Sequence, residues 1–253
     1  MALSEFVEEC RGQEATLTVL NRESERPVYR LLSRFFGDAV TLQEVETVDG
    51  TAPTNAVVLE RDGEAVAASS LATLRDELLL VNSDVYVTGT RRLGDVETPS
   101  VVTELAGVPY AATVRSDYPR EKLLLIELSR HVEATAYRAG DGRLAAGFQF
   151  LSRLDDERGT RRVYDRLGSD TGVDTHVYGV ADGTSPPDSV TTHAVSADEI
   201  RRSWFVLHES DTHPHEAAGM VAVWRDPHTW EGFWTFDPDR VAAVLDYLDR
   251  TYD

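Results

Sequence analysis

Arginine side chains are concentrated between residues 120 and 166, where 10 basic residues are accompanied by 8 acidic ones. A guanidinium group can hold a carboxylate or a phosphate through two parallel hydrogen bonds, so this concentration could form a pocket for an anion. The candidates are Arg130, Arg153, Arg158, Arg161 and Arg162. The alternative, which we favour, is local pairing, because acids lie about one helical turn away. The expected pairs are Arg130 with Glu127 or Glu133, and the later arginines with Asp155 or Glu157.

A second group combines nitrogen and oxygen ligands near the C-terminal end. His208, His213 and His215 are interleaved with Glu209, Asp211 and Glu216. Imidazole and carboxylate groups are ligands for zinc, so this spacing could hold a metal ion. Pro214 and the crowding of polar residues favour a turn between two strands instead. We predict no metal site here.

Other potential nucleophiles and bases have simpler interpretations. Lys122 is the only lysine and stands among charged neighbours, whereas a Schiff-base lysine needs a desolvating pocket. His131 lies on a predicted helix, where we expect it to be solvated. His176 and Tyr178 share one face of a predicted strand, and a buried histidine satisfied by a neighbour is commoner there than a proton shuttle. The glycine, serine and histidine signatures of common catalytic sites are absent. We expect a protein that is not an enzyme.

Aromatic side chains gather in the last fifty residues. All four tryptophans lie there, with three phenylalanines: Trp204, Trp224, Trp230, Trp234, Phe205, Phe233 and Phe236. Such side chains fill cores and also line ligand pockets. We favour a core beneath the final helix. Because alternate residues of a strand point to opposite faces, we expect either Trp234 and Phe236 or Phe233 and Thr235 to remain for a pocket rim.

The elements that position these groups alternate between helix and strand after residue 119. A long helix is predicted over residues 120–139, a strand over 144–150, and a second helix that begins at the capping box of Ser152 and Asp155 and ends at Gly168. A buried strand follows at 173–180. Further strands are predicted at 204–208 and 219–224, after a short helix capped by Ser196 and Glu199. The last helix has Asp237 as its N-cap and buries Val241, Val244, Leu245 and Leu248.

The first half is less regular. A strand is predicted over residues 17–20, a helix over 27–36, a helix over 69–81 and a strand over 84–88. The clearest signal is Asp62-Gly63 between two apolar runs, because a tight hairpin turn requires positive φ at both turn residues. We predict an α/β fold with a mixed, partly parallel sheet and helices on both faces. The predicted organisation is an N-terminal α/β module over residues 1–118 and a second domain over 119–253, with one compact unit as the alternative.

Composition excludes several functions. Asp plus Glu number 44 against 25 Lys plus Arg, which gives a net charge of −19. Phosphate-driven binding of nucleic acid and docking on anionic lipid both need a basic face. An acidic surface with almost no lysine is typical of adaptation to high salt, which screens like-charge repulsion. Cys10 is the only cysteine, no apolar run could span a membrane, and the first residues do not resemble a signal peptide. We expect a cytoplasmic protein without a membrane association.

Five segments together resemble the DICT sensory domain: residues 125–133 (LIELSRHVE), 144–149 (LAAGFQ), 162–164 with Leu167, 177–179 (VYG) and 234–238 (WTFDP). The resemblance covers residues 119–253, about half of the chain. Including residues 78–89 (LLLVNSDVYVTG), the whole chain is similar to stand-alone DICT proteins of halophilic archaea. The DICT domain is named for its occurrence beside diguanylate cyclases and in two-component systems, and is regarded as a sensor of an input signal.

The resemblance implies a non-catalytic sensory or signal-transduction module. Its pattern points to seven residues: Ser129, Arg130, Glu133, Phe148, Gln149, Tyr164 and Tyr178. Arg153 and His176 complete the set of candidate ligand contacts, and we expect the groups on the two middle helices and the intervening strand to converge on one cavity. The expected partner is an unknown small molecule or a two-component or transcriptional signalling protein, with a homodimer as a further candidate. The cofactor is unknown. The alternatives are an enzyme with a histidine general base and an arginine clamp, and a purely structural interaction module.

Overall fold

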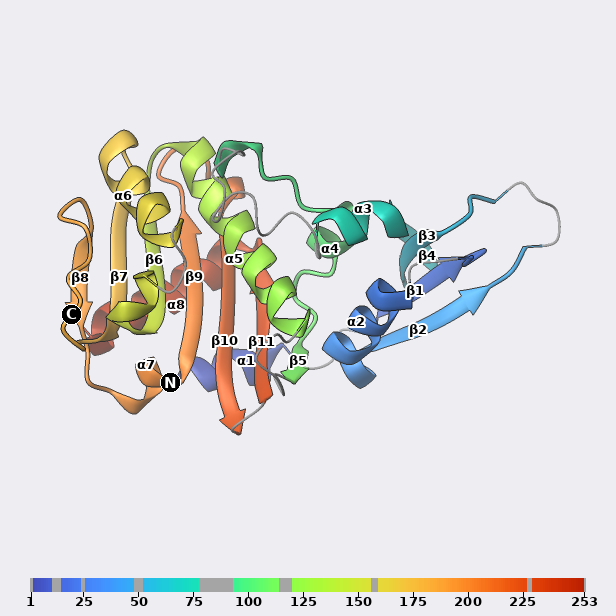
Figure 1. Ribbon diagram of the computed structural model, residues 1–253, viewed down its shortest axis with the longest axis horizontal. Helices are drawn as coiled ribbons and strands as arrows, with labels where there is room; N and C mark the ends of the chain where they lie inside the picture. Colours follow the sequence, from blue (N-terminus) through green and yellow to red (C-terminus); the bar gives the residue numbers. More distant parts are fainter. Residues whose placement is uncertain are drawn as a thin grey trace.

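Two β-sheets lie side by side in the computed structural model (Figure 1). The structure describes residues 2–10, 15–23, 26–47, 52–77, 93–113, 120–155, 159–226 and 229–252. A four-stranded sheet has the order β2-β1-β3-β4 and consists of β1 (Ala15–Leu20), β2 (Val40–Val45), β3 (Ala56–Arg61) and β4 (Glu64–Ser70). A seven-stranded sheet has the order β5-β11-β10-β9-β6-β7-β8. Its strands are β5 (Tyr110–Thr113), β6 (Arg143–Phe150), β7 (Asp174–Val180), β8 (Thr191–Ala194), β9 (Ser203–Glu209), β10 (Ala218–Asp226) and β11 (Thr229–Thr235).

Both sheets are mixed, as predicted. The pairs β1–β2, β6–β7 and β7–β8 are parallel, and the other neighbours are antiparallel. The predicted hairpin between β3 and β4 is confirmed, because Asp62 and Gly63 have φ values of 53° and 80°. The mixed sheet predicted after residue 119 is present, and the strands before residue 71 form a second sheet of their own.

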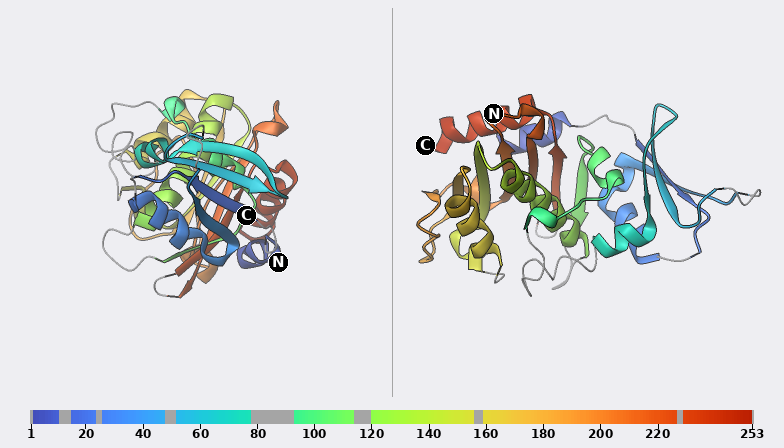
Figure 2. Two further views of the ribbon diagram at one scale, coloured as in Figure 1. Left: turned by 90° about the vertical axis from the view of Figure 1, so that its right-hand side faces the viewer. Right: turned by 90° about the horizontal axis from the view of Figure 1, so that it is seen from above.

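Helices cover both faces of the seven-stranded sheet (Figure 2). On one face lie α5 (Arg120–Ala139) and α6 (Thr160–Asp170). On the opposite face lie α1 (Leu3–Glu9), α7 (Asp198–Arg201) and α8 (Pro238–Tyr252). The remaining α-helices in the described part are α2 (Arg26–Phe36), α3 (Leu71–Arg75) and α4 (Ser100–Glu104). Single 3-10 turns occupy Gly37–Ala39, Leu93–Asp95, Leu151–Asp155 and Pro214–Glu216. The predicted α/β class with helices on both faces is confirmed.

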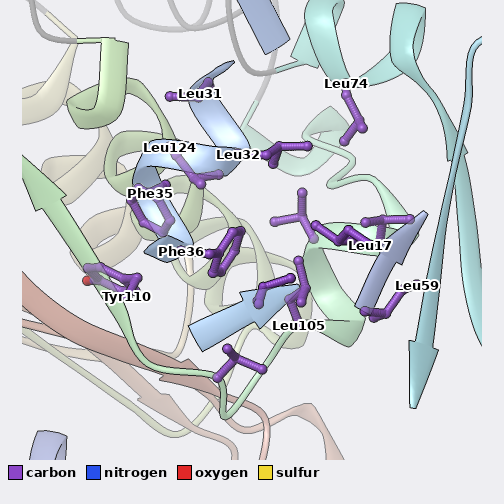
Figure 3. Close-up of a cluster of buried hydrophobic side chains, with 14 of the residues drawn as sticks. Leu17, Leu31, Leu32, Phe35, Phe36, Leu59, Leu74, Leu105, Tyr110 and Leu124 are labelled. Atoms are coloured by element: carbon purple, nitrogen blue, oxygen red, sulfur yellow. The ribbon is translucent and has the colours of Figure 1, made fainter. Parts of the chain in front are cut away.

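One hydrophobic core joins the two sheets (Figure 3). Leu17 and Leu59 of the small sheet belong to the same buried cluster as Leu124 of α5 and Trp234 of β11. Burying these side chains removes apolar surface from water, which is the main force that holds the layers together. α1 and β5 both precede residue 119 and join the seven-stranded layer, so the boundary between the sheets does not fall at residue 118. The division into domains 1–118 and 119–253 stays a prediction.

Two predicted helix starts are wrong because the capping side chains have other partners. Ser152 lies in a 3-10 turn and hydrogen-bonds the carboxylate of Asp182, so α6 begins only at Thr160. Glu199 lies inside α7 and accepts hydrogen bonds from the Leu3 amide at 2.7 Å and from two tyrosine hydroxyls. By contrast, Asp237 accepts a bond from the Asp239 amide at 3.0 Å, and the predicted buried face of α8 is confirmed.

The first-half predictions have mixed outcomes. Residues 69 and 70 belong to β4, and Ser70 caps the shorter helix α3 by accepting a hydrogen bond from the Thr73 amide. The predicted strand at 84–88 and the segment 78–89 lie outside the described residues. The helix predicted over 27–36 is confirmed as α2, and Gly37 follows it with a φ of 51°.

The turn between α5 and β6 contains two glycines that differ in how closely the neighbouring backbone packs against them. Gly140 and Gly142 have φ values of 70° and 78°, but a Cβ on Gly142 would lie 2.0 Å from the Glu209 carbonyl oxygen, whereas a Cβ on Gly140 would meet nothing within 4 Å. Gly140→Ala should lower the free energy of unfolding by about 1–2 kcal/mol through backbone strain alone. Gly142→Ala should cost a further ~1–3 kcal/mol because the clash is with backbone. Denaturant unfolding in high salt measures both, and equal costs would contradict the packing described.

Candidate functional site

A buried polar cluster lies between α5 and α6. The Nη1 atom of Arg130 is 2.7 Å from Oε2 of Glu133, and both side chains are almost fully buried. The other oxygen of Glu133 accepts a hydrogen bond from the Tyr164 hydroxyl at 2.8 Å. Arg130 also reaches the Thr160 hydroxyl at 3.4 Å, and Glu127 is buried one turn before it. The structure thus brings together Arg130, Glu133 and Tyr164, three of the predicted site residues.

Helix geometry explains how these groups meet. Arg130 and Glu133 are three residues apart on α5, which places them on one side of the helix. Tyr164 lies one turn after Thr160 on α6, so both point toward α5. Phe148 of β6 packs edge-on against the Tyr164 ring, with centroids 5.0 Å apart. Ser129 is buried beside the cluster, but its hydroxyl bonds back to the Ile126 carbonyl at 2.8 Å.

The end of β6 is strained next to this cluster. Gln149 has a φ of 60°, in the left-handed region that side chains other than glycine rarely adopt. The register of β6 against β7 shifts between Gly147 and Phe150, which marks a β-bulge there. Gly147 is needed because a Cβ would lie 2.3 Å from the Phe205 ring. Strained residues of this kind persist where the surrounding structure fixes them and are frequent at functional sites.

The crossovers before β7 and before β9 lie on opposite faces of the sheet. The connection from β6 to β7 runs through α6 on the α5 face, whereas the connection from β8 to β9 runs through α7 on the opposite face. β6 and β9 are antiparallel neighbours, so the carboxyl ends of these two strands lie at opposite edges of the sheet, and the carboxyl end of β6 lies beside that of its parallel neighbour β7. Phe148 and Gln149 occupy the carboxyl end of β6, and Arg153 follows as an exposed side chain.

Two predicted site residues lie on the other face of the sheet. Tyr178 is fully buried in the cluster beneath α8, where its hydroxyl is 3.1 Å from Nη2 of Arg143. Arg143 is held by both carboxylate oxygens of Asp249, at 2.7 and 2.5 Å. His176 is beside His193 on the same face. His176 and Tyr178 therefore lie on the opposite face from Arg130 and Glu133, because alternate residues of β7 point to opposite faces.

Local pairing explains the arginines, as favoured from the sequence. Besides Arg130 with Glu133, Arg161 lies 2.6 Å from Asp155, and it also reaches the Ser185 carbonyl. Arg162 is exposed. Arg158 and the side chain of Lys122 lie outside the described residues. The described part of the chain therefore shows ion pairs at the two arginines that anchor α5 and α6, and no shared anion clamp built from them.

Two of the three C-terminal histidines lie at a turn between strands, and the third lies in a strand. His213 and His215 lie in and beside the 3-10 turn between β9 and β10, which confirms the predicted turn. His208 is buried in β9 with Nδ1 3.1 Å from the Arg143 carbonyl oxygen, and burial lowers the pKa of its imidazole. Within the described ranges, no three or more His, Cys, Asp or Glu residues are placed to hold a metal ion.

The aromatic residues are mostly core, as favoured. Phe233, Trp234 and Thr235 are all buried, so the expectation that one face of this strand remains for a pocket rim is wrong. The reason is that helices cover both faces of β11. Trp234 donates a hydrogen bond from Nε1 to the Val102 carbonyl at 3.2 Å, which satisfies its only donor. Trp224 is 39% exposed and stacks on Trp230.

His131 is partly buried rather than solvated as expected. Its Nδ1 lies 2.8 Å from the Thr98 hydroxyl, and the ring packs edge-on against Phe236. Burial, aided by the nearby charge of Arg138, lowers the pKa of His131 to about 4. Sequence reasoning missed Thr98, Thr160 and Arg143, because each acts on residues more than 25 positions away. No local spacing signals such contacts.

Comparison with known proteins identifies no family. No family model and no curated protein matches the chain. Among solved structures, it is similar to the polyphosphate kinase from Porphyromonas gingivalis, at 10% sequence identity and a TM-score of 0.34. The alignment covers 98% of this chain and 47% of that one, so this chain spans about half of that protein. A TM-score this low carries no argument about fold or function. In the described part, no helix is both long and apolar enough to cross a membrane.

The buried ion pair should be far more important for stability than the exposed one. Removing one partner of a buried pair leaves an uncompensated charge in a low-dielectric interior and costs about 3–5 kcal/mol. We expect Arg130→Met to lower the free energy of unfolding by this amount. Arg161→Met is the matched control, because its ion pair with Asp155 is largely exposed and should change stability by less than ~1 kcal/mol. Urea unfolding in high salt measures both variants, and similar values for the two would contradict the burial of Arg130.

The lowered pKa of His131 should make stability depend on pH. The unfolded chain binds a proton at this residue below about pH 6.5, while the folded protein binds it only below about pH 4. The stabilisation is therefore complete above about pH 6.5 and is lost as the pH falls toward 4. His131→Gln removes this titration. Between pH 7 and 4, the wild type should lose about 3 kcal/mol more free energy of unfolding than the variant. Parallel pH profiles of both proteins would exclude the effect.

Proposed function

We propose that this chain is a non-catalytic sensory module of the DICT type, which binds a small molecule or a signalling protein in the cytoplasm of a halophile. The observation that carries the proposal is the strained Gln149 at the carboxyl end of β6. Its neighbour Phe148 packs on Tyr164, which belongs to the buried cluster of Arg130, Glu133 and Tyr164. The sequence resemblance places the family pattern on these same residues. The described residues show no nucleophile activated by a base in this place, which favours binding over chemistry.

The accessible contacts for a ligand are Gln149, which is half-buried, and Arg153, which is exposed. An amide and a guanidinium suit a partner that carries oxygen acceptors, such as a carboxylate or a phosphate. Arg130 is a less direct contact, because it is buried and already bonded to Glu133. We assign the buried cluster the role of a support that fixes the position of α6 relative to α5.

The backbone strain at Gln149 allows this site to change conformation when a ligand binds. A ligand shifts a conformational equilibrium only by its differential affinity for the two states. A ligand bound to the Gln149 amide in its left-handed conformation would stabilise the bulge, while relaxation of the bulge would move Phe148 away from Tyr164. The resulting movement of α6 would then be the signal that a partner protein detects. We propose that a separate two-component or transcriptional protein reads this change.

Native mass spectrometry tests the proposal on protein purified from a halophilic lysate and exchanged into concentrated ammonium acetate. We expect a non-covalent mass that disappears on denaturation. Gln149→Gly removes the amide without opposing the backbone conformation, because glycine adopts positive φ freely. Retained ligand should fall at least tenfold in this variant, with unchanged or higher stability.

Asp62→Gly is the matched control, because Asp62 also has a positive φ of 53° but lies in the hairpin of the small sheet. It should retain the ligand in full. If the wild type and Gln149→Gly retain the ligand equally, the ligand does not bind at the end of β6. Turnover of a substrate by a protein that retains no ligand would overturn the non-catalytic assignment itself.

A second candidate, an enzyme with a histidine base, is favoured by one contact. Nε2 of His176 is 2.9 Å from Oδ2 of Asp174, which is close to the pairing that orients a general base, although the two groups form no hydrogen bond. Against this candidate, the nearby Arg143 is bonded to Asp249 and so offers a poor clamp for a substrate. A loss of catalytic activity in His176→Gln with intact folding would support the enzyme, once a substrate is found.

A further inference from the structure

Two histidines meet at the edge of the seven-stranded sheet. His176 is on β7 and His193 is on the edge strand β8, which pairs with β7 in parallel. The register sets His193 beside Tyr178, and His176 lies two residues before Tyr178, so all three side chains are on one face. Nδ1 of His176 is 2.8 Å from Nε2 of His193. Neither histidine belongs to the cluster proposed as the sensory site, which lies on the opposite face.

The two rings are held in place by their neighbours. The His193 ring stacks on Tyr178 with centroids 4.1 Å apart and an angle of 7° between the planes. Tyr178 is fixed in turn by the hydrogen bond between its hydroxyl and Arg143, which Asp249 holds through two oxygens. On the other side, the carboxylate of Asp174 lies 2.9 Å from Nε2 of His176. The His193 end of the pair is therefore held in place by stacking and hydrogen bonds, while the Asp174 carboxylate is near the His176 end.

We infer that His176 and His193 form a site for a divalent transition-metal ion, bound through Nδ1 of His176 and Nε2 of His193. Neutral imidazole nitrogens are common metal ligands, and a ligating histidine almost always directs its other nitrogen to a carboxylate or carbonyl. Asp174 lies close to that position for His176, with its Oδ2 atom 2.9 Å from Nε2 but without hydrogen-bond geometry. In the absence of metal, one of the two nitrogens donates a hydrogen bond to the other.

The separation of the two nitrogens indicates which ion fits. With metal–nitrogen bonds of about 2.0–2.1 Å, a right angle at the metal places the nitrogens about 2.9 Å apart, and a tetrahedral angle about 3.4 Å apart. The observed 2.8 Å is close to the right angle of tetragonal coordination. Cu²⁺ and Ni²⁺ prefer this geometry, and Cu²⁺ is bound most tightly along the first-row series. Both rings must turn slightly so that their lone pairs meet at the ion, and water completes the coordination.

This site differs from a three-ligand metal centre. The described residues hold no group of three or more suitable side chains, so the ion would keep open positions. Such a site binds more weakly than a closed structural site, and its occupancy follows the supply of metal. The net charge of −19 raises the local concentration of cations around the whole molecule.

Cu²⁺ is the probe for the test. The full chain is titrated with Cu²⁺ in high salt at pH 7.5, with calorimetry for affinity and electron paramagnetic resonance for the number of imidazole nitrogens on the copper. We expect one site with two nitrogens. His193→Asn should lower the affinity at least tenfold and leave one nitrogen.

Two further variants test whether Asp174 positions His176 and whether other surface histidines bind the copper. Asp174→Asn should lower the affinity by about 10–100-fold while both nitrogens stay on the copper, which is the signature of a positioning residue. The double variant H213N/H215N is the matched control, because it removes two histidines with rings 5.7 Å apart elsewhere on the surface. It should bind Cu²⁺ as the wild type does.

Unchanged affinity in His193→Asn, or loss of binding in H213N/H215N, would overturn the assignment. If His193→Asn fails to fold, the number of imidazole nitrogens bound to Cu²⁺ in H213N/H215N tests the site instead. Two nitrogens in this control variant support the assignment, and one or none overturns it. The outcome is independent of the proposed sensory function, because the ligand test at Gln149 uses neither histidine.

Discussion

The burial of both faces of the seven-stranded sheet is the constraint on which the rest of the structure depends. A polar side chain that points from such a sheet has little access to water and must find a partner inside the protein. On the α5 face, Arg130 meets Glu133 and Tyr164; on the α8 face, Arg143 meets Asp249. Because alternate residues of a strand point to opposite faces of the sheet, these two polar groups lie on opposite faces and do not share one site.

The long helix α5 connects this arrangement to the rest of the molecule. Its first turns contribute Leu124 and Leu128 to the core shared with the small sheet, and its middle carries Arg130 and Glu133. A packed helix moves as a unit, so a displacement of α6 against α5 can reach the small sheet without a separate pathway. Tertiary packing of this kind is the physical basis on which a binding event at β6 could have a distant effect.

The two proposals concern opposite faces and different chemistry. At the end of β6, a strained backbone and an amide favour reversible binding of an oxygen-rich partner. At the edge of the sheet, two imidazoles and a carboxylate favour a cation. The acidic surface attracts the second kind of ligand and repels the first, so an anionic partner at Gln149 depends on directional hydrogen bonds more than on long-range attraction.

The class of fold and several of its elements could be predicted from the sequence. Helical periodicity predicted α5 and α8, Asp62-Gly63 predicted the hairpin, and one-turn spacing predicted the pair of Arg130 and Glu133. These features depend on neighbours along the chain. Tertiary structure alone decided that Ser152 bonds Asp182, that Thr98 covers His131, and that His176 faces His193. Each of these contacts joins elements distant in sequence, and only strand order and the covering helices determine which distant side chains meet.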